Sequence, residues 1–436
     1  MLKSVSIGGL ASTGRRLGWG VADQGLVSLI NFEIGVAVAR SVAPREFGVF
    51  ALLFAAYLVA SGLNRAFSCE PLAIRFSGSD VERWQEQASA AVGTALAFGV
   101  VAGLTFAIAA LFLPPGAASA WWALALGLPG LLVQDCCRYA FFSSRRGGSA
   151  FAGDVIWAAG VTVAIVSVAW FGRGGLVAYV ASWSGAGTVA AVFSSWWGGL
   201  RPRPWRAPSW FREHADLVWR YAFEFLAGGG AIQLAFYGVG ATAGLAAVGA
   251  LRAAQLVLGP LQVVLAGMGV VSLPEAARLT RDSRSSLRIA MSGLSGFFVA
   301  ASAVWLAAIL CVPDEWGRGL LKSGWTSGRA VVVPMGLALA GIGAAHGAIT
   351  GLRALAAARS SLKARLLATP LIICGGVGGA LVGQEQGAAI GLAIASWVAV
   401  IPWWAAFETE LGSRTRTAPD RDMHPEPSLL RGNVAV

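Results

Sequence analysis

The sequence predicts an all-α polytopic membrane protein of about 12 transmembrane helices, built as two six-helix halves around a central cavity. Three observations support this fold class. The chain of 436 residues is 56% apolar and only 13% charged, with a mean hydropathy of +0.66. Apolar segments of membrane-spanning length recur along it, and its basic residues gather in alternate loops. A soluble protein needs far more surface charge than this composition supplies.

Twelve apolar segments are long enough to cross a ~30 Å hydrocarbon core at ~1.5 Å rise per residue. The predicted spans are 17–39, 47–67, 89–113, 118–137, 150–171, 176–197, 219–241, 246–272, 288–312, 330–351, 366–383 and 387–407. They divide the chain into an N-terminal segment (1–16), a first half (17–200), a linker (201–218), a second half (219–407) and a tail (408–436). Because the tail lacks apolar periodicity, we expect it to be disordered and cytoplasmic.

The distribution of basic residues tests this division. With a cytoplasmic N-terminus, 26 of the 33 lysines and arginines fall in cytoplasmic segments and six in outer segments, and Arg252 falls inside a span. Cytoplasmic loops of membrane proteins carry an excess of Lys and Arg. The asymmetry predicts twelve spans with both termini cytoplasmic. It also accounts for the net charge of +11 without a nucleic-acid partner.

The first span, 17–39, carries unusually many polar groups: Asp23, Gln24, Asn31 and Glu33. Carboxylates inside a membrane are costly and should face protein or water rather than lipid. At ~100° per residue, Asp23, Gln24 and Asn31 fall in one sector of the helix, with Glu33 roughly 80° beyond it. We therefore expect this face to line an aqueous cavity.

The two halves are weakly alike. A shift of 201 residues places Asp23 on Glu224 and Gly48 on Gly249. Each half then opens with a span that carries an acid near its cytoplasmic end. In membrane proteins built from such repeats, the binding site lies between the halves.

The intramembrane acids are candidates for gating or ion coupling. Asp23 and Glu224 could titrate, bind a coupling cation, or pair with an arginine of the other half. The alternative is a fixed structural ion pair that closes the cytoplasmic side. Glu33 lies nearer the outer leaflet, where it is either a coupling residue or a packing partner of Arg40 or Arg45.

Arg252 is the one base that the topology leaves inside a span, about two turns into the eighth. A guanidinium in a water-filled lumen can bind phosphate in a bidentate manner, and Gln255 shares its face at i+3. Together with Asn31, these residues are the candidate ligand-binding group. The alternative is an eighth span that starts later, which would leave Arg252 at the outer interface.

Asp135 and Arg138, at i and i+3, end the fourth span and are expected to form a structural ion pair. Asp154, in the first turn of the fifth span, is a candidate member of the same cluster, and Arg65 is placed similarly at the end of the second span. The glycine runs 228–230 and 375–379 predict either close helix contacts or points of bending.

Several kinds of chemistry have no support in the sequence. It shows no phosphate-binding loop, no nucleophile motif and no metal-ligand cluster. The five cysteines include no CxxC pair. We therefore expect neither an enzyme nor a bound metal or cofactor.

Two groups of residues form a recognisable pattern. The first, at the opening of the chain, consists of Asp23-Gln24, Asn31, 38–40, 44–48 and Glu70-Pro71. The second, at the start of the second half, consists of 248–255, Gly259-Pro260 and Leu273-Pro274. Together they resemble the polysaccharide biosynthesis (O-antigen flippase-like) transporters of the multidrug/oligosaccharidyl-lipid/polysaccharide exporter superfamily.

This resemblance implies a twelve-helix, V-shaped flippase in the bacterial cytoplasmic (inner) membrane. It would move a polyprenyl-pyrophosphate-linked oligosaccharide for lipopolysaccharide or exopolysaccharide synthesis, coupled to an H⁺ or Na⁺ gradient. Arg252 would bind substrate, and Asp23 and Glu224 would gate or couple. Membrane lipids, a glycan polymerase and glycosyltransferases would be its neighbours. Lumenal bases are few, so a strongly anionic glycan is not implied.

Two other functions stay open. A multidrug/cation antiporter of the same superfamily would depend on an acidic site rather than on Arg252. A membrane glycan ligase or glycosyltransferase needs an exposed catalytic loop, and the one long outer loop, 313–329, offers Asp314 and Glu315.

Overall fold

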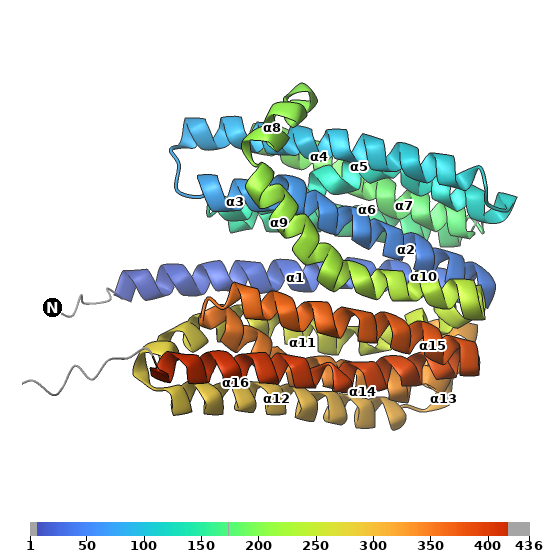
Figure 1. The fold of residues 1–436 in the computed structure, drawn as a ribbon. Coiled ribbons are helices and arrows are strands. Elements are labelled where there is room, and N and C mark those ends of the chain that lie inside the picture. Colours follow the sequence, from blue (N-terminus) through green and yellow to red (C-terminus); the bar gives the residue numbers. More distant parts are fainter. Residues whose placement is uncertain (1–6, 173, 417–436) are drawn as a thin grey trace, which may run out of the picture.

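The computed structural model describes residues 7–172 and 174–416, and every regular element in these ranges is a helix (Figure 1). The first half consists of seven α-helices and one π-helical turn. These are α1 (Ile7–Ser41), α2 (Pro44–Asn64), η1 (Arg65–Cys69), α3 (Glu70–Phe76), α4 (Val81–Ala110), α5 (Pro115–Ser143), α6 (Gly147–Trp170) and α7 (Leu176–Gly198).

The second half follows without a long unstructured linker. It consists of η2 (Pro204–Arg206), α8 (Ala207–Glu213), α9 (Ala215–Phe225), η3 (Leu226–Gly230), α10 (Ala231–Ala243), α11 (Leu245–Asp282), α12 (Arg284–Leu310), α13 (Asp314–Leu321), α14 (Ser323–Ala354), α15 (Ala358–Val398) and α16 (Val400–Arg416). Most of the predicted linker is therefore helical, with α8 leading into α9.

Helix starts follow local chemistry. Pro44 occupies the first turn of α2, where a missing N–H costs nothing, and Glu46 accepts a hydrogen bond from the Ala43 amide at 3.3 Å. The Asp80 carboxylate caps α4 by accepting from the Arg83 amide at 2.8 Å. These caps fix the turns that reverse the chain between spans.

Eleven stretches of the described chain are long and apolar enough to cross a membrane, and the last of them makes two crossings. It covers 56 residues, 358–413, which as one straight helix would measure about 84 Å, far more than a bilayer. The backbone leaves the helical conformation at Gly383 and Gln384. The chain then folds back, so that a Cβ on Gly391 would lie 1.9 Å from the Gly375 carbonyl oxygen. The structure thus has the predicted twelve crossings, and Gly375 and Gly379 mediate close helix packing.

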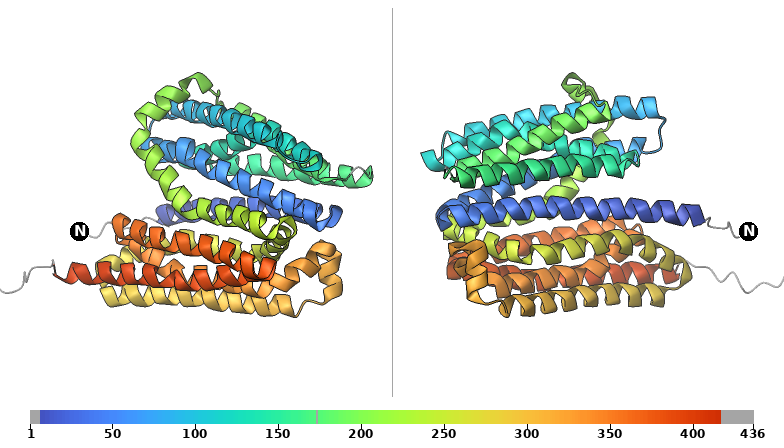
Figure 2. Two further views of the ribbon diagram at one scale, coloured as in Figure 1. Left: turned by 45° about the vertical axis from the view of Figure 1, so that its right-hand side comes forward. Right: turned by 180° about the vertical axis from the view of Figure 1, so that it is seen from behind.

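The twelve crossings form two helical halves with α1 along their boundary (Figures 1 and 2). Both ends of the described chain lie on one side of the molecule, which we call the terminal side. The opposite side is called distal. There the first turns of α2 and α11 touch: a Cβ on Gly48 would lie 1.8 Å from the Leu245 carbonyl oxygen, and one on Gly249 would lie 2.9 Å from that of Pro44. Only glycine permits this approach, which closes the distal side.

Two π-helical turns interrupt the crossings near the terminal side. Turn η1 follows α2 and places Arg65, whereas η3 lies between α9 and α10 and contains glycines 228–230. Such turns are frequent at functional sites because they re-aim side chains. A Cβ on Gly228 would lie 2.5 Å from Arg365 Nη1, so this glycine lets Arg365 reach the backbone of the turn.

The last helix is longer than the sequence predicts. Helix α16 continues to Arg416 rather than ending at residue 407. Glu408 forms an ion pair of 2.7 Å with Arg288 of α12, and Glu410 accepts a hydrogen bond from Ser360. These contacts hold two further turns, which hydropathy alone does not register. The rest of the predicted tail lies outside the described residues.

Candidate functional site

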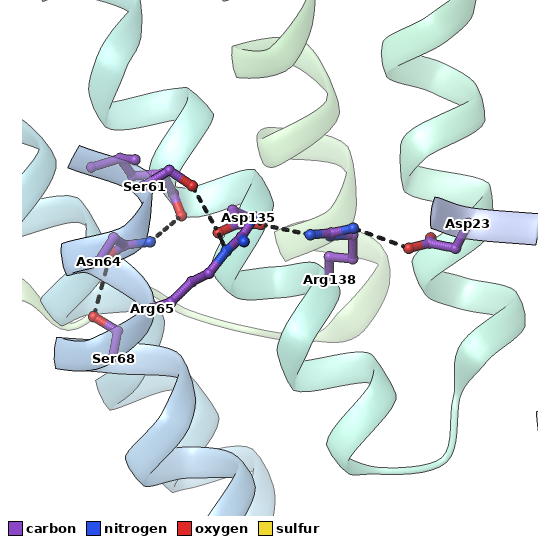
Figure 3. Close-up of polar contacts among 8 residues, drawn as sticks. Asp23, Ser61, Asn64, Arg65, Ser68, Asp135 and Arg138 are labelled. Carbon is purple, nitrogen blue, oxygen red and sulfur yellow. Dashed lines mark hydrogen bonds and ion pairs between the residues drawn. The ribbon is translucent and has the colours of Figure 1, made fainter. Parts of the chain in front are cut away.

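A chain of four charged side chains crosses the first half, with Asp23, Asp135 and Arg138 buried and Arg65 at its partly exposed end (Figure 3). Arg65 donates to both carboxylate oxygens of Asp135, at 2.8 and 3.0 Å. Arg138 donates to Asp135 at 2.9 Å and to Asp23 at 3.2 Å. The network joins η1, α5 and α1, so it fixes the ends of three crossings to one another.

Neutral polar groups support this network. Ser61 donates to Asp135 at 3.4 Å, and Asn64 donates to the Leu132 carbonyl at 3.0 Å. Ser68 donates to Asn64 at 3.4 Å. Buried polar groups need such partners, since each unsatisfied group costs free energy.

The charges of the network do not balance. Asp154 of α6 lies beside Asp23 and accepts a hydrogen bond from Gln134 at 3.0 Å. Asp23 Oδ1 and Asp154 Oδ2 are buried and have no hydrogen-bond donor among the described residues. Three carboxylates (Asp23, Asp135 and Asp154) thus face two guanidinium groups. A proton or a monovalent cation at the Asp23–Asp154 pair would restore neutrality.

The prediction that Asp23 lines the cavity is wrong. Its side chain is 2% exposed and points into the first half, toward Arg138. Gln24 and Asn31 do line a cavity. Successive helical residues point ~100° apart, so Asp23 faces α5 and α6 while Gln24 faces the second half.

A cavity of about 870 Å³ lies between the halves toward the terminal side, and we call it the interhalf cavity. Three tyrosines contribute to its wall: Tyr57, Tyr139 and Tyr221. Its charged lining residues are Arg65, Glu70, Glu224, Arg353 and Arg365. Arg65 pairs with Asp135 and Arg365 with Glu224, so Arg353 is the lining arginine that has no ion pair among the described residues.

A second cavity of about 620 Å³, the Arg252 cavity, lies between α1, α2 and α11. It shares Asn31 and Leu58 with the interhalf cavity, so the two adjoin. The Arg252 guanidinium lies 4.1 Å from the centre of the Phe54 ring and donates to Gln255 Oε1 at 3.2 Å. Its Nε has no partner among the described residues.

The predicted ligand-binding group is therefore assembled in space. Arg252, Gln255 and Asn31 line one cavity, and the Asn31 side-chain oxygen is likewise buried without a described partner. Helix α11 begins at Leu245, two turns before Arg252. Arg252 thus lies within the cavity and not at the distal end of its helix.

The other two predicted acids lie apart from Asp23. Glu224 lines the interhalf cavity and lies 3.7 Å from Arg365 of α15, in its own half. Among the described residues, neither Asp23 nor Glu224 pairs with an arginine of the opposite half, because Asp23 pairs with Arg138 and Glu224 with Arg365. Glu33 accepts a hydrogen bond from Thr162 of α6 at 3.0 Å and lines neither cavity.

Arg365 and Arg353 line the interhalf cavity, although the sequence predicts a loop at both positions. The predicted eleventh span is 366–383, whereas α15 begins at Ala358. Arg365 thus lies two turns inside the helix, with its guanidinium 5.9 Å from the Trp403 ring centre. Hydropathy does not indicate this early helix start, because Arg359, Lys363 and Arg365 lower the mean hydropathy of the segment.

No protein-family model and no curated protein matches the sequence. Solved structures do match over most of the chain. An inward-facing MATE-family multidrug resistance transporter of the MOP superfamily has a TM-score of 0.70 at 14% identity, covering 91% of this chain and 96% of its own. The inward closed lipid II flippase MurJ has a TM-score of 0.66 at 10% identity, covering 93% and 89%. An outward-facing MATE-family transporter has a TM-score of 0.59 at 15% identity, covering 93% and 96%.

This multi-pass membrane protein thus has the two-half fold shared by MATE transporters and MurJ, as the sequence resemblance predicts. At these identities the likeness concerns the fold alone.

Proposed function

We propose that this protein is a flippase that moves a polyprenyl-pyrophosphate-linked oligosaccharide across the bacterial cytoplasmic membrane by alternating access. The observation that carries the proposal is Arg252, whose guanidinium lines a cavity between the two halves and forms no ion pair with any described residue. A diphosphate supplies the acceptors that such a group lacks. MurJ, a lipid II flippase, shares the fold.

The cavity lining favours this function over a cation antiporter. The Arg252 cavity is lined by the amides of Gln24, Asn31, Gln255 and Gln262 and by no carboxylate among the described residues. A cationic drug would meet a like charge there, whereas amides and a guanidinium suit sugar hydroxyls and a diphosphate. The antiporter remains the second candidate because MATE transporters share the fold.

We propose that ion coupling resides in the first half. Asp23 and Asp154 form the one part of the buried network with an excess negative charge, and Arg138 contacts Asp23. Binding of H⁺ or Na⁺ there would weaken the electrostatic attraction between Asp23 and Arg138. Because Arg138 belongs to α5, the position of α5 would respond. Glu224 with Arg365 would act as a gate beside the interhalf cavity.

The basic residues orient the protein with its terminal side toward the cytoplasm. Substrate made on the cytoplasmic face would then enter the interhalf cavity, reach Arg252, and leave after the distal contact of α2 and α11 separates. A polymerase and glycosyltransferases of the same glycan pathway are the partners that this role implies.

A leaflet assay tests the function. In a strain lacking this protein, lipid-linked glycan should accumulate on the cytoplasmic face, and the wild-type gene should restore its outward display. Arg252→Ala should fail to restore it, while Arg278→Ala, an exposed arginine on the same helix, should restore it fully. Normal outward display in the deletion strain would reject the flippase. Loss of drug resistance instead of glycan display would favour the antiporter.

A further inference from the structure

A second basic pocket lies at the terminal side of the second half. Its volume is about 540 Å³, and it is formed by α9, the end of α14, and the turn into α15. Four arginines line this arginine pocket: Arg220, Arg353, Arg359 and Arg365. No predicted site residue except Glu224 belongs to it.

The pocket has an excess of positive charge. Glu224 is its one acidic lining residue and lies 3.7 Å from Arg365. Arg220, Arg353 and Arg359 form no ion pair with any described residue. Three guanidinium groups without ion-pair partners thus line one pocket, and an anion with several acceptor oxygens would offset their mutual repulsion.

The backbone adds to this potential. Helix α15 starts at Ala358, and Ala357 before it has no side chain that caps the first N–H groups. The short side chains of residues 356–358 leave that helix start open to the pocket. The dipole of the helix that runs from Ala358 to the break at Gly383 favours an anion at this end.

Apolar side chains adjoin the charged ones. Phe223 and Leu362 line the pocket and are 52% and 38% exposed, and Leu366, one turn after Leu362, is 45% exposed. Cationic and lipophilic groups thus meet near the membrane edge of the terminal side. This combination fits a lipid head group and its first tail carbons better than a soluble anion.

The pocket borders the interhalf cavity. Glu224, Arg353 and Arg365 line both spaces, so they form the wall between them. Arg365 holds this wall by donating to the Glu224 carbonyl at 3.2 Å beside Gly228. A head group that leaves the arginine pocket past this wall enters the interhalf cavity directly.

We infer that the arginine pocket binds the phosphate or diphosphate head of a membrane lipid. We further infer that lipid-linked substrate docks there, between α9 and α15, before it reaches the interhalf cavity. This second statement rests on the proposed function. The first does not.

Binding to the purified protein tests the pocket, measured by native mass spectrometry in detergent. All proteins carry Arg252→Gln, which removes the cavity arginine from the readout. The probes are a polyisoprenyl diphosphate, the matching neutral polyisoprenol, phosphatidylglycerol and inorganic diphosphate. The test variant is Arg220→Gln/Arg359→Gln, which leaves the interhalf cavity unchanged. The matched control is Arg201→Gln/Arg212→Gln, two exposed arginines outside the pocket.

The test variant should bind polyisoprenyl diphosphate about ten-fold or more weakly, since it loses two charge-assisted contacts. The control should bind within about two-fold, and Arg220→Lys/Arg359→Lys, which keeps the charge, should retain most of the affinity. Equal binding by the test variant and the control overturns the inference, as does equal affinity for the diphosphate and the polyisoprenol.

Competition separates the sources of phosphate. Displacement of the diphosphate lipid by phosphatidylglycerol at equal concentration supports a head-group site but overturns its role as a substrate dock. If inorganic diphosphate displaces the diphosphate lipid at equal concentration, the isoprenoid tail adds nothing to the affinity. That result overturns the inference that the pocket binds a lipid. If the flippase proposal is wrong, outward glycan display persists in the deletion strain while the binding defect remains. If the pocket is wrong, display still depends on Arg252 and the binding defect is absent.

Discussion

Asp135 is the residue on which the buried network depends most. It accepts three hydrogen bonds from Arg65 and Arg138 and a fourth from Ser61. Both it and Arg138 are under 10% exposed. Two guanidinium groups can stay charged in this setting because one carboxylate lies between them.

Replacing Asp135 by Asn should destabilise the protein by about 3–5 kcal/mol, because it leaves two partly or fully buried cations without their shared counter-charge. The measurement is the free energy of unfolding in mixed micelles. Glu275→Gln, which breaks the exposed pair with Arg278, is the control and should cost under about 0.5 kcal/mol. If Asp135→Asn has the same free energy of unfolding as the wild type, the network does not stabilise the fold.

For individual residues, the sequence predicts ion pairs within one helix but not ion pairs between helices. The i,i+3 spacing of Asp135 and Arg138 is enough to expect their contact, and the contact is present. Asp23 was assigned to the cavity because a helical wheel gives relative angles but not the neighbour that each angle faces. The bridge from Arg65 to Asp135 depends on a π-helical turn, which has no pattern in the sequence.

Among the elements, α2 and α11 decide which side of the molecule is closed. Gly48 and Gly249, which the repeat relates by a shift of 201 residues, face each other at this contact. Equivalent residues meet in this way only at the axis that relates the two halves. The structure thus supports the internal repeat and places its axis at the distal closure.

Gly48→Ala should open the distal side, since the added Cβ would lie 1.8 Å from a backbone oxygen that cannot rotate away. Ser327 of α14 lines the same contact. In a Cys311→Ser/Cys374→Ser background, which removes the two exposed thiols, a membrane-impermeant maleimide should label Ser327→Cys several-fold faster when Gly48→Ala is present. Gly116→Ala, with no atom within 4 Å of the new Cβ, should leave labelling unchanged. Unchanged labelling with Gly48→Ala would contradict the closure.

The junction of α8 and α9 is fastened to α3 by a histidine. Arg75 donates to His214 Nδ1 at 2.7 Å and to both oxygens of Asp216 at 2.8 Å. Burial, together with the Arg75 guanidinium, lowers the pKa of His214 below its usual 6.5. The ring is therefore neutral and accepts from Arg75. Protonation would remove that bond and place two cations in contact.

Stability from this junction should be complete above pH 6.5 and decline as the pH falls below it, because the unfolded histidine then binds a proton that the folded one resists. The thermal midpoint of the wild type should thus fall more steeply from pH 7 to pH 5 than that of His214→Gln. Parallel pH profiles for the two proteins would count against a neutral His214. Asp80→Asn, which weakens the exposed cap of α4, serves as a control. Its thermal midpoint should be lower than that of the wild type, but it should fall with pH as steeply as that of the wild type.

Elements were predicted well where apolar runs define them and poorly at their ends. All twelve crossings follow from hydropathy and the basic-residue pattern. The start of α15 and the end of α16 do not, because charged residues there are held by tertiary contacts with Glu224, Arg288 and Ser360. The arginine-lined wall of the interhalf cavity was missed for the same reason.

For the molecule as a whole, the two halves form a closed distal contact and a cavity toward the terminal side. A ligand reaching Arg252 from the terminal side would pass the interhalf cavity, whose wall includes Arg65, Arg353 and Arg365. We propose that this path carries a diphosphate-linked lipid. Fold likeness alone does not decide it, because MATE transporters and MurJ share the architecture.

Reconstituted liposomes test this claim most directly. A fluorescent polyprenyl-diphosphate oligosaccharide is placed in one leaflet, and its arrival in the other is followed with a membrane-impermeant quencher. The wild type and Arg278→Gln should move it at equal rates, and Arg252→Gln should be about 10- to 100-fold slower, as expected for the loss of a charge-assisted contact worth about 1.5–3 kcal/mol. Wild-type rates no faster than those of protein-free liposomes, or equal rates for the wild type and Arg252→Gln, would contradict it.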